Sequence, residues 1–186
     1  MEKDITSPAS LRQIIDYCPE IGVMFWLPRS PCFFKSGKRT PEHAAANWNS
    51  RYAGTRALSS IGNHGYMRGN IGNKSFLAHR VAMAMCLDTW EFGFVDHING
   101  NKLDNRRENL RLCSNAENLR NSKPRGGSSK YKGVCFHNQN KNWISNITID
   151  GKTIHIGSFD DEVSAALAYD EAAKRLHGEY ARINFR

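Results

Sequence analysis

The chain has 186 residues, 40% of them hydrophobic, which favours one domain or two small ones over a single large core. Lys and Arg outnumber Asp and Glu by 26 to 18, so the formal net charge is +8 and an anionic partner is expected. No apolar run approaches the roughly 18 residues that a membrane-spanning helix needs. The first ten residues also lack the apolar segment of a signal peptide. These features predict a soluble, intracellular protein.

The cysteines are odd in number and scattered, and no two of them form a C-x-x-C pair. This pattern favours neither a disulfide framework nor a zinc ribbon. We interpret the cysteines as reduced packing residues, because buried free cysteine is common. They are Cys18, Cys32, Cys86, Cys113 and Cys135.

The positive charge is unevenly distributed along the chain. Residues 1–60 carry eight basic and five acidic groups, and residues 96–127 carry seven and four. Residues 128–157 have four Lys against Asp150 alone, whereas residues 158–186 have four basic and six acidic groups. One basic and one acidic face are therefore expected in the C-terminal region. Residues 28–47 are predicted to be a long basic loop that orders on a partner, and the Pro, Gly and Ser of 122–129 predict a flexible connector.

Four elements are expected before residue 90. Ser10 is expected to cap a short helix over 10–17, and residues 23–27 are expected to form a strand. Residues 66–68 and 75–77 predict a hairpin around the Gly- and Asn-rich turn 69–73. Residues 78–87 have helical spacing, with Val81 and Met85 four positions apart.

The segment 94–122 carries the chemistry. It predicts a strand at 95–98, a loop that begins with an Asn-Gly turn, a second strand at 110–112, and a helix that starts at Ser114. Ser114 and Glu117 have the spacing of a capping box. The oxygens of Asp96 and Asn118 are hard ligands suited to Mg²⁺, and the imidazole of His97 can deprotonate a water near neutral pH.

A simpler interpretation of the Asp-His pair stays open. In it, Asp96 and Asn99 cap a tight turn and His97 is an exposed side chain. Adjacent strand residues also face opposite sides. Asp96 and His97 therefore share a site only if the strand ends or twists between them.

The string DHINGNKLDNRRENLR, followed by Asn118, resembles the HNH endonucleases of the ββα-metal fold, and most of all their H-N-N subclass in phage homing and free-standing enzymes. By this resemblance, His97 corresponds to the general base. Asn109 corresponds to the middle Asn, which braces the loop and orients the histidine. Asp96 and Asn118 correspond to the two protein ligands of a single divalent ion, Mg²⁺ or Mn²⁺.

The resemblance implies hydrolysis of DNA phosphodiester bonds, by nicking or double-strand cutting, with 5′-phosphate and 3′-hydroxyl ends. The string LAHR upstream also resembles these proteins, and His79 and Arg80 are interpreted as support or phosphate contacts. Further candidates for phosphate contacts are basic residues of the same region, with a solvated mixed-charge face as the alternative. They are Arg106, Arg107, Arg111 and Arg120.

From Lys130 the pattern predicts three short strands and one helix that ends at Gly178. This module resembles the plant Apetala/ethylene-response-factor DNA-binding domain in its YKGV, IGSF, AALAYD and INF strings. The resemblance implies that the sheet enters the major groove of DNA. The candidate DNA-contacting residues are Lys130, Lys132, Cys135, His137, Asn146, Thr148, Thr153 and His155. Trp143 and Phe159 are interpreted as core residues because both belong to apolar alternation.

The predicted fold class is therefore α+β. A ββα-metal nuclease core at 61–122 follows an N-terminal α/β extension at 1–60, which is partly loop. A linker at 123–129 leads to a module at 130–186, in which a three-stranded antiparallel sheet packs on one helix. The expected partner is double-stranded DNA, bound by a monomer or a dimer, with no membrane and no protein partner. The expected location is the cytoplasm of a bacterial host, with a phage or prophage gene.

Two alternatives to the endonuclease stay open. One is a DNA-binding regulator with an inactive HNH fold, against which the intact Asp96, His97, Asn109 and Asn118 argue. The other is RNA or membrane-surface binding through bulk charge, which explains the net charge of +8 but not the ordered motifs.

Overall fold

The computed structural model describes residues 5–124 and 126–185. The chain divides into two compact units, Met1–Leu112 and Cys113–Arg186, which are described separately. Both units combine helices with small antiparallel sheets, which confirms the predicted α+β class. No helix among the described residues is long and apolar enough to cross a membrane. All five cysteines are free.

The first unit begins with helix α1 (Pro8–Ile14) and the antiparallel pair β1 (Ile15–Cys18) and β2 (Val23–Trp26). The prediction of a helix over 10–17 capped by Ser10 is wrong. Ser7 is the cap, because its hydroxyl accepts from the Ser10 N–H at 3.2 Å and Pro8 suits the first helical position. The helix therefore starts earlier and ends where β1 begins.

The segment predicted as a long loop contains the short 3₁₀ helix η1 (Pro31–Phe33) and the 12-residue helix α2 (Pro41–Tyr52). The loop prediction for 41–47 is therefore wrong. The Thr40 side chain accepts from the His43 N–H at 3.3 Å, and Pro41 stands at the first helical position. Glu42 adds an acidic side chain in the first turn.

Strands β3 (Ser60–Ile61), β4 (Met67–Ile71) and β5 (Lys74–Leu77) form the next sheet, in that order. The predicted hairpin is confirmed, but its strands are longer than expected and the turn is confined to Gly72 and Asn73. Helix α3 (Ala78–Leu87) follows with the predicted bounds. Its buried residues include Val81 and Ala82.

One hydrophobic core spans the first unit. It includes Leu11 and Ile14 of α1, Val81 of α3, Val95 of β6 (Phe94–His97) and Leu110 of β7 (Leu110–Cys113). Residues on both sides of the predicted boundary at residue 60 therefore share a core. Residues of the N-terminal extension therefore contribute to the core on which β6 and β7 pack. These two strands pair in a two-stranded sheet.

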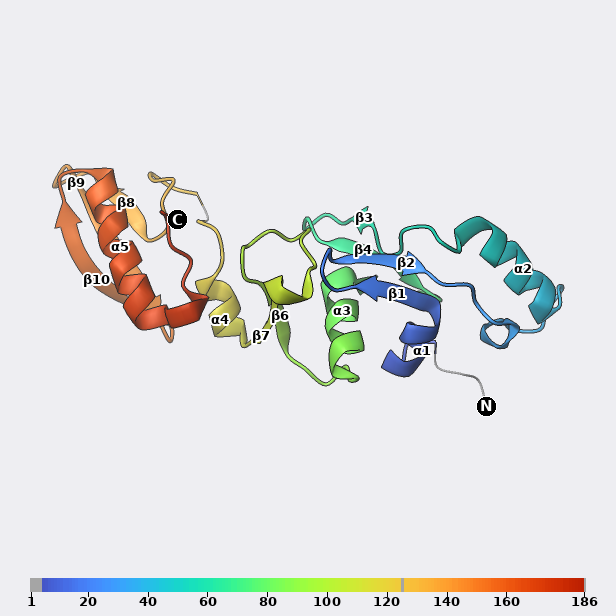
Figure 1. Cartoon of the computed structure of the whole chain (residues 1–186). Helices are drawn as coiled ribbons and strands as arrows, with labels where there is room; N and C mark the ends of the chain where they lie inside the picture. The colour runs from blue at the N-terminus through green and yellow to red at the C-terminus, as the bar shows by residue number, and fades with distance from the viewer. Residues whose placement is uncertain (1–4, 125, 186) are drawn as a thin grey trace. The chain divides into compact units, whose positions relative to one another are not determined.

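The second unit contains α4 (Asn115–Arg120), a three-stranded sheet, α5 (Glu162–His177) and the 3₁₀ helix η3 (Gly178–Tyr180). The sheet has the order β10 (Lys152–Phe159), β9 (Asn142–Ile149), β8 (Val134–His137), and α5 lies along one face of it (Figure 1). The predicted three strands and one helix are confirmed. The capping box of Ser114 and Glu117 is also present.

Candidate active site

Strand β6, a loop over 98–109 that closes in the 3₁₀ turn η2 (Arg107–Asn109), strand β7 and helix α4 follow one another in the predicted order. The buried amide of Asn109 connects the two ends of the loop. Its Oδ1 accepts from the Asn99 N–H at 2.9 Å, and its Nδ2 donates to the Asp104 carbonyl at 2.8 Å. One side chain thus satisfies backbone groups from both halves of the loop and holds them together, as predicted for a residue that braces the loop.

Asp104 adds a second set of contacts within the same loop. Its carboxylate accepts from the Asn99 side chain at 2.7 Å and from the Arg106 guanidinium at 2.9 Å. The hydrogen bonds from Arg106 hold the pKa of Asp104 at about 2, well below its usual value. The carboxylate therefore stays charged, and the loop that follows His97 has a fixed conformation.

His97 is the last residue of β6 and is 3% exposed. Its Nε2 lies 3.2 Å from Oδ1 of Asn105, itself buried, and the Tyr17 hydroxyl donates to the Asn105 carbonyl at 2.8 Å. Because Oδ1 only accepts, Nε2 carries the hydrogen and the lone pair of the neutral ring is on Nδ1. Burial lowers the pKa of His97 below its usual value, although Asn105 and the charge of Asp96 act in the opposite direction. The ring is therefore neutral at neutral pH, as a general base must be.

His79 of α3 and Tyr66 pack against this histidine. The His79 ring meets the His97 ring edge-on, with centroids 5.0 Å apart, and the Tyr66 ring lies 5.0 Å from His79 and 5.9 Å from His97. Burial lowers the pKa of His79 to about 3, with smaller contributions from His97 and Arg80. His79 is therefore a neutral packing residue, which agrees with its interpretation as a support.

Asp96 also lies in β6 but makes different contacts. Its Oδ2 accepts from Arg111 Nε at 3.1 Å and from Arg111 Nη2 at 2.9 Å. Arg111 comes from the neighbouring strand β7, and both side chains are largely buried. Asp96 and His97 thus have separate hydrogen-bond partners on the two sides of the strand, as alternation requires. The strand ends at His97, where the Gly100 N–H donates to the His97 carbonyl at 2.7 Å.

Asn118 lies in the middle of α4, in the second compact unit, with its side chain partly exposed. The carboxylate of Asp96 and the amide oxygen of Asn118 are each hard donors of the kind that Mg²⁺ prefers. Within residues 5–124 and 126–185 no cluster of three or more His, Cys, Asp or Glu residues has the arrangement of a metal site.

Most arginines predicted to grip phosphates have partners within the protein. Arg106 pairs with Asp104 and with Glu108 at 2.7 Å, and Arg107 donates to the Leu110 carbonyl at 2.9 Å. Arg80 donates to the Gly93 carbonyl at 2.8 Å and covers the Phe92 ring. Arg111 pairs with Asp96 and Arg120 with Asp150. Exposed surface ion pairs contribute little, so those of Arg106 do not prevent a contact with DNA.

The candidate DNA contacts on the C-terminal sheet share one face. Thr148 is opposite Thr153, and Asn146 is opposite His155, with Asn146 Oδ1 3.2 Å from His155 Nδ1. These positions alternate with the buried Ser145 and Ile147, which face α5. The face opposite the helix also carries Cys135 and His137, whose Nδ1 accepts from the Asn140 N–H at 3.3 Å. Lys130 is exposed beside Tyr131.

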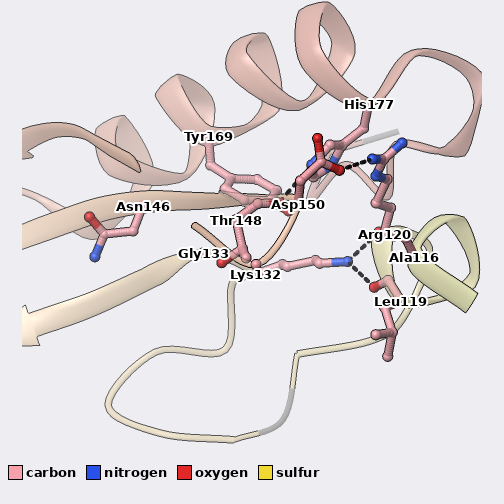
Figure 2. A pocket seen from close by; sticks show the side chains of 11 residues that line it. Ala116, Leu119, Arg120, Lys132, Gly133, Asn146, Thr148, Asp150, Tyr169 and His177 are labelled. Atoms are coloured by element: carbon pink, nitrogen blue, oxygen red, sulfur yellow. Dashed lines mark hydrogen bonds and ion pairs between the residues drawn. The ribbon is translucent and has the colours of Figure 1, made fainter. Parts of the chain in front are cut away.

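Lys132 does not lie on that face. Its ammonium group donates to the carbonyls of Leu119, Arg120 and Ser122 at the C-terminal end of α4, as Figure 2 shows for Leu119 and Arg120. Nearby, Arg120 Nη2 lies 3.2 Å from Asp150 Oδ1. These contacts place α4 beside the sheet, around a pocket of about 330 Å³ (Figure 2). Helix α4 therefore groups with the C-terminal unit, and the division of the two units falls before the predicted linker at 123–129.

Known proteins with similar sequences match two regions of this chain. The HNH endonuclease family model matches residues 76–120. Protein 3.8 of Escherichia phage T7 is 34% identical over 90 residues, which are 48% of this chain and 74% of that protein. The chain belongs to the HNH endonuclease family. An uncharacterized HNH endonuclease of Acanthamoeba polyphaga mimivirus is 37% identical over 91 residues, which are 49% of this HNH protein and 46% of the viral one.

The C-terminal region of this HNH protein has relatives of another kind. An AP2-like ethylene-responsive transcription factor of Arabidopsis thaliana is 45% identical over 62 residues, which are 33% of this chain and 13% of that protein. The chain thus spans about an eighth of the plant protein and about half of the mimivirus protein. The predicted combination of an HNH region with an Apetala-type module is confirmed.

Two residues of the HNH region gained a role only from the structure. Asn105 holds His97 in place, and Tyr66 packs against both histidines. Asn105 follows Asp104 in the string that carries the family resemblance. Its place in that string was the one sequence feature that could have indicated a role in the site. Tyr66 lies 31 positions before His97, and nothing in the local sequence pattern indicates the contact.

Proposed function

We propose that the protein is a divalent-metal-dependent DNA endonuclease that hydrolyses phosphodiester bonds, either nicking or cutting both strands. The observation that carries this proposal is His97, a buried and neutral imidazole that Asn105 orients within the segment matching the HNH endonuclease family. A histidine in this state is prepared to accept a proton.

In the proposed reaction, Nδ1 of His97 takes a proton from a water molecule. That water attacks phosphorus in line, and the bond to the 3′ oxygen breaks, which leaves a 5′-phosphate and a 3′-hydroxyl. Asn105 keeps the ring in the required tautomer, and Asn109 keeps the loop that carries Asn105 in shape. General-base catalysis of this kind contributes roughly 10²–10⁴-fold to a rate.

Asp96 and Asn118 are the residues that would hold a single Mg²⁺ or Mn²⁺ ion. When bound, such an ion neutralises charge that develops on the phosphate and the leaving oxygen. Arg111 already pairs with Asp96. Its guanidinium therefore lies beside a residue that would hold the ion and offers a charged donor to phosphate.

The same ion pair is the one observation that favours the second candidate function, a DNA-binding regulator with an inactive HNH fold. If Arg111 remains on Asp96 at 2.9 Å, the carboxylate is less available to an ion. The two functions differ in one measurable property, since both bind DNA and only the endonuclease breaks it.

Full-length protein incubated with supercoiled plasmid is expected to produce nicked or linear DNA in Mg²⁺ or Mn²⁺, and none in EDTA. Asp96→Ala is expected to lower cleavage about as strongly as EDTA, because the carboxylate is the charged ligand of the proposed ion. Conversion of the plasmid is followed on agarose gels at increasing metal concentration. Undiminished cleavage in EDTA contradicts metal dependence, and binding without cleavage in every metal supports the regulator.

We also propose that the C-terminal sheet contributes to site selection through its face opposite α5. The face carries Asn146, Thr148, Thr153 and His155, whose amide, hydroxyl and imidazole groups can hydrogen-bond to base edges or phosphates. Binding as a monomer or as a dimer decides whether one strand or both are cut. Sequencing the ends produced on genomic DNA gives the target and the number of strands cut.

Lys132→Met is expected to destabilise α4, because the Lys132 ammonium group donates to carbonyl groups at the end of this helix. The salt dependence of DNA binding is expected to stay unchanged. Hydrogen exchange of the 114–121 amides is expected to accelerate. Lys130→Met is the matched control, since Lys130 is exposed and makes no hydrogen bond to α4 among those of the described residues. If Lys132 instead grips a phosphate, its variant lowers the slope of log K against log salt by about 0.9 and leaves exchange unchanged.

A further inference from the structure

A strongly basic segment, residues 28–56, precedes the part of the chain that matches the HNH endonuclease family. Residues 28–56 carry six basic side chains and one acidic one, Glu42, so five of the eight net charges fall within 29 residues. The HNH match covers residues 76–120 instead. The basic residues are Arg29, Lys35, Lys38, Arg39, Arg51 and Arg56.

Part of this segment forms a groove of about 560 Å³ along α2. Arg39, His43, Asn47 and Arg51 line it at intervals of four residues, and all four are exposed. His43, Asn47 and Arg51 lie within α2, where side chains at this spacing form a row along one side of the helix, and Arg39 lies just before the Thr40 cap. Two turns separate His43 from Arg51, roughly 12 Å of helix axis. No carboxylate lines the groove, and neither Arg39 nor Arg51 has an acidic partner among the described residues.

Trp48, which also lines the groove, and Asn49 fix α2 to the body of the first unit. Asn49 accepts from the Arg29 N–H at 2.8 Å and donates to the Arg29 carbonyl at 3.0 Å. Trp48 packs edge-on against Trp26, with centroids 5.7 Å apart, and the Arg29 guanidinium lies 3.9 Å from the Trp48 ring centroid. Burial lowers the pKa of Arg29 to about 10. The aromatic rings therefore hold the helix in place, and the basic row is presented on a rigid support.

A row of cations and amides on an anchored helix matches the chemistry of a phosphodiester backbone. Arg39 and Arg51 supply charge, and Asn47 and His43 supply hydrogen-bond donors. Base stacking is a weaker match, because Trp48 is occupied by Trp26, Arg29 and Tyr52, whose ring centroid lies 5.3 Å away. Duplex DNA, whose phosphates are regularly spaced on the outside, fits the row better than a single strand does.

We infer that α2 and the residue before its cap, through Arg39, His43, Asn47 and Arg51, form a third DNA-binding surface that contacts the phosphate backbone of the duplex on one flank of the cleavage site. The inference rests on the proposed DNA substrate, and it requires binding but not cutting. It assigns a role to the basic residues at the two ends of α2. Because phosphates carry no sequence information directly, this surface adds affinity and register without adding base preference.

The test is the full-length double variant Arg39→Gln/Arg51→Gln. We expect duplex affinity to fall about tenfold for every sequence, and the slope of log K against log salt to fall by about 1.8, because two phosphate contacts are lost. Hydroxyl-radical footprinting is expected to lose protection on one flank only. The charge-preserving Arg39→Lys/Arg51→Lys is expected to retain most of the affinity.

The matched control is Lys174→Gln/Arg175→Gln, which removes the same charge from an exposed part of α5, on the helix that covers the other face of the C-terminal sheet. If both double variants change affinity and salt slope equally, bulk charge explains the effect and the inference of a DNA-binding surface on α2 is wrong. A loss seen with RNA hairpins but not with duplex DNA also overturns it. If the wild type binds duplex DNA but never cuts it, the endonuclease proposal fails while the α2 surface is still tested by the binding data.

Discussion

His97→Ala is expected to lower DNA cleavage by at least roughly 10²-fold, the lower end of the contribution of a general base. Affinity for the duplex is expected to stay within about twofold, because His97 is 3% exposed and has no surface to offer the DNA backbone. The reason for the loss is the oriented lone pair on Nδ1, which Asn105 fixes through Nε2. Single-turnover cleavage and equilibrium binding, measured on the same duplex, separate the two effects.

Removal of a buried ring also leaves a cavity beside His79 and Tyr66, which costs stability. His97→Asn is therefore made alongside, because it retains a polar side chain and much of the volume. His64→Ala is the control, since His64 is an exposed histidine of the same unit. Comparable cleavage by His97→Asn and wild type, with both folded, would remove His97 from the role of base.

The parts of the fold that could be predicted from the sequence are those with local signals. The apolar spacing of 78–87 gave the bounds of α3, and Ser114 with Glu117 gave the start of α4. Asp150 and Gly151, a typical hairpin pair, form the turn between β9 and β10, where both residues have positive φ. In each case the residues that carry the signal are the residues that make the contact.

The errors have an equally local cause. The helix α2 was predicted as loop because Pro and Gly are frequent between 28 and 41, although Thr40 followed by Pro41 is itself a start signal. The cap of α1 was assigned to Ser10 rather than Ser7, although Pro8 favours the earlier start. Composition outweighed capping chemistry in the prediction for α2, whereas the prediction for α1 selected the wrong serine as the cap.

The candidate site was predictable as a set of residues but not as a set of contacts. The resemblance selected His97, Asn109 and Asp96, and the structure adds what each of them touches. The partners of the charged residues could not be predicted, because a guanidinium or ammonium group pairs with any nearby carboxylate or carbonyl. Lys132 illustrates this, since it was expected on DNA and lies on the carbonyl end of α4.

Gly133→Ala is expected to destabilise the C-terminal module by about 2–5 kcal/mol, which combines the strain of a left-handed Ala with overpacking of a core. Gly133 has φ +77°, and a Cβ at this position would lie 2.0 Å from Cδ2 of Tyr169 and 2.6 Å from the Asn146 carbonyl oxygen. Tyr169 is 2% exposed in a core with Ile147 and Ala173, so its ring has no room to move. Either the ring or the start of β8 must shift.

Gly151→Ala separates the two causes. Gly151 has φ +79°, nearly the same backbone, but nothing lies within 4 Å of its would-be Cβ. Its substitution is therefore expected to cost only the strain, about 1–2 kcal/mol. Hydrogen exchange of the β9 amides in the full-length protein measures the loss of stability in both variants. The affinity for duplex DNA measures how that loss affects DNA recognition. Equal acceleration of exchange in the two variants would show that the contact with Tyr169 is not what requires glycine at position 133. A larger effect at Gly133 would show that the close packing of the start of β8 on Tyr169 of α5 requires it.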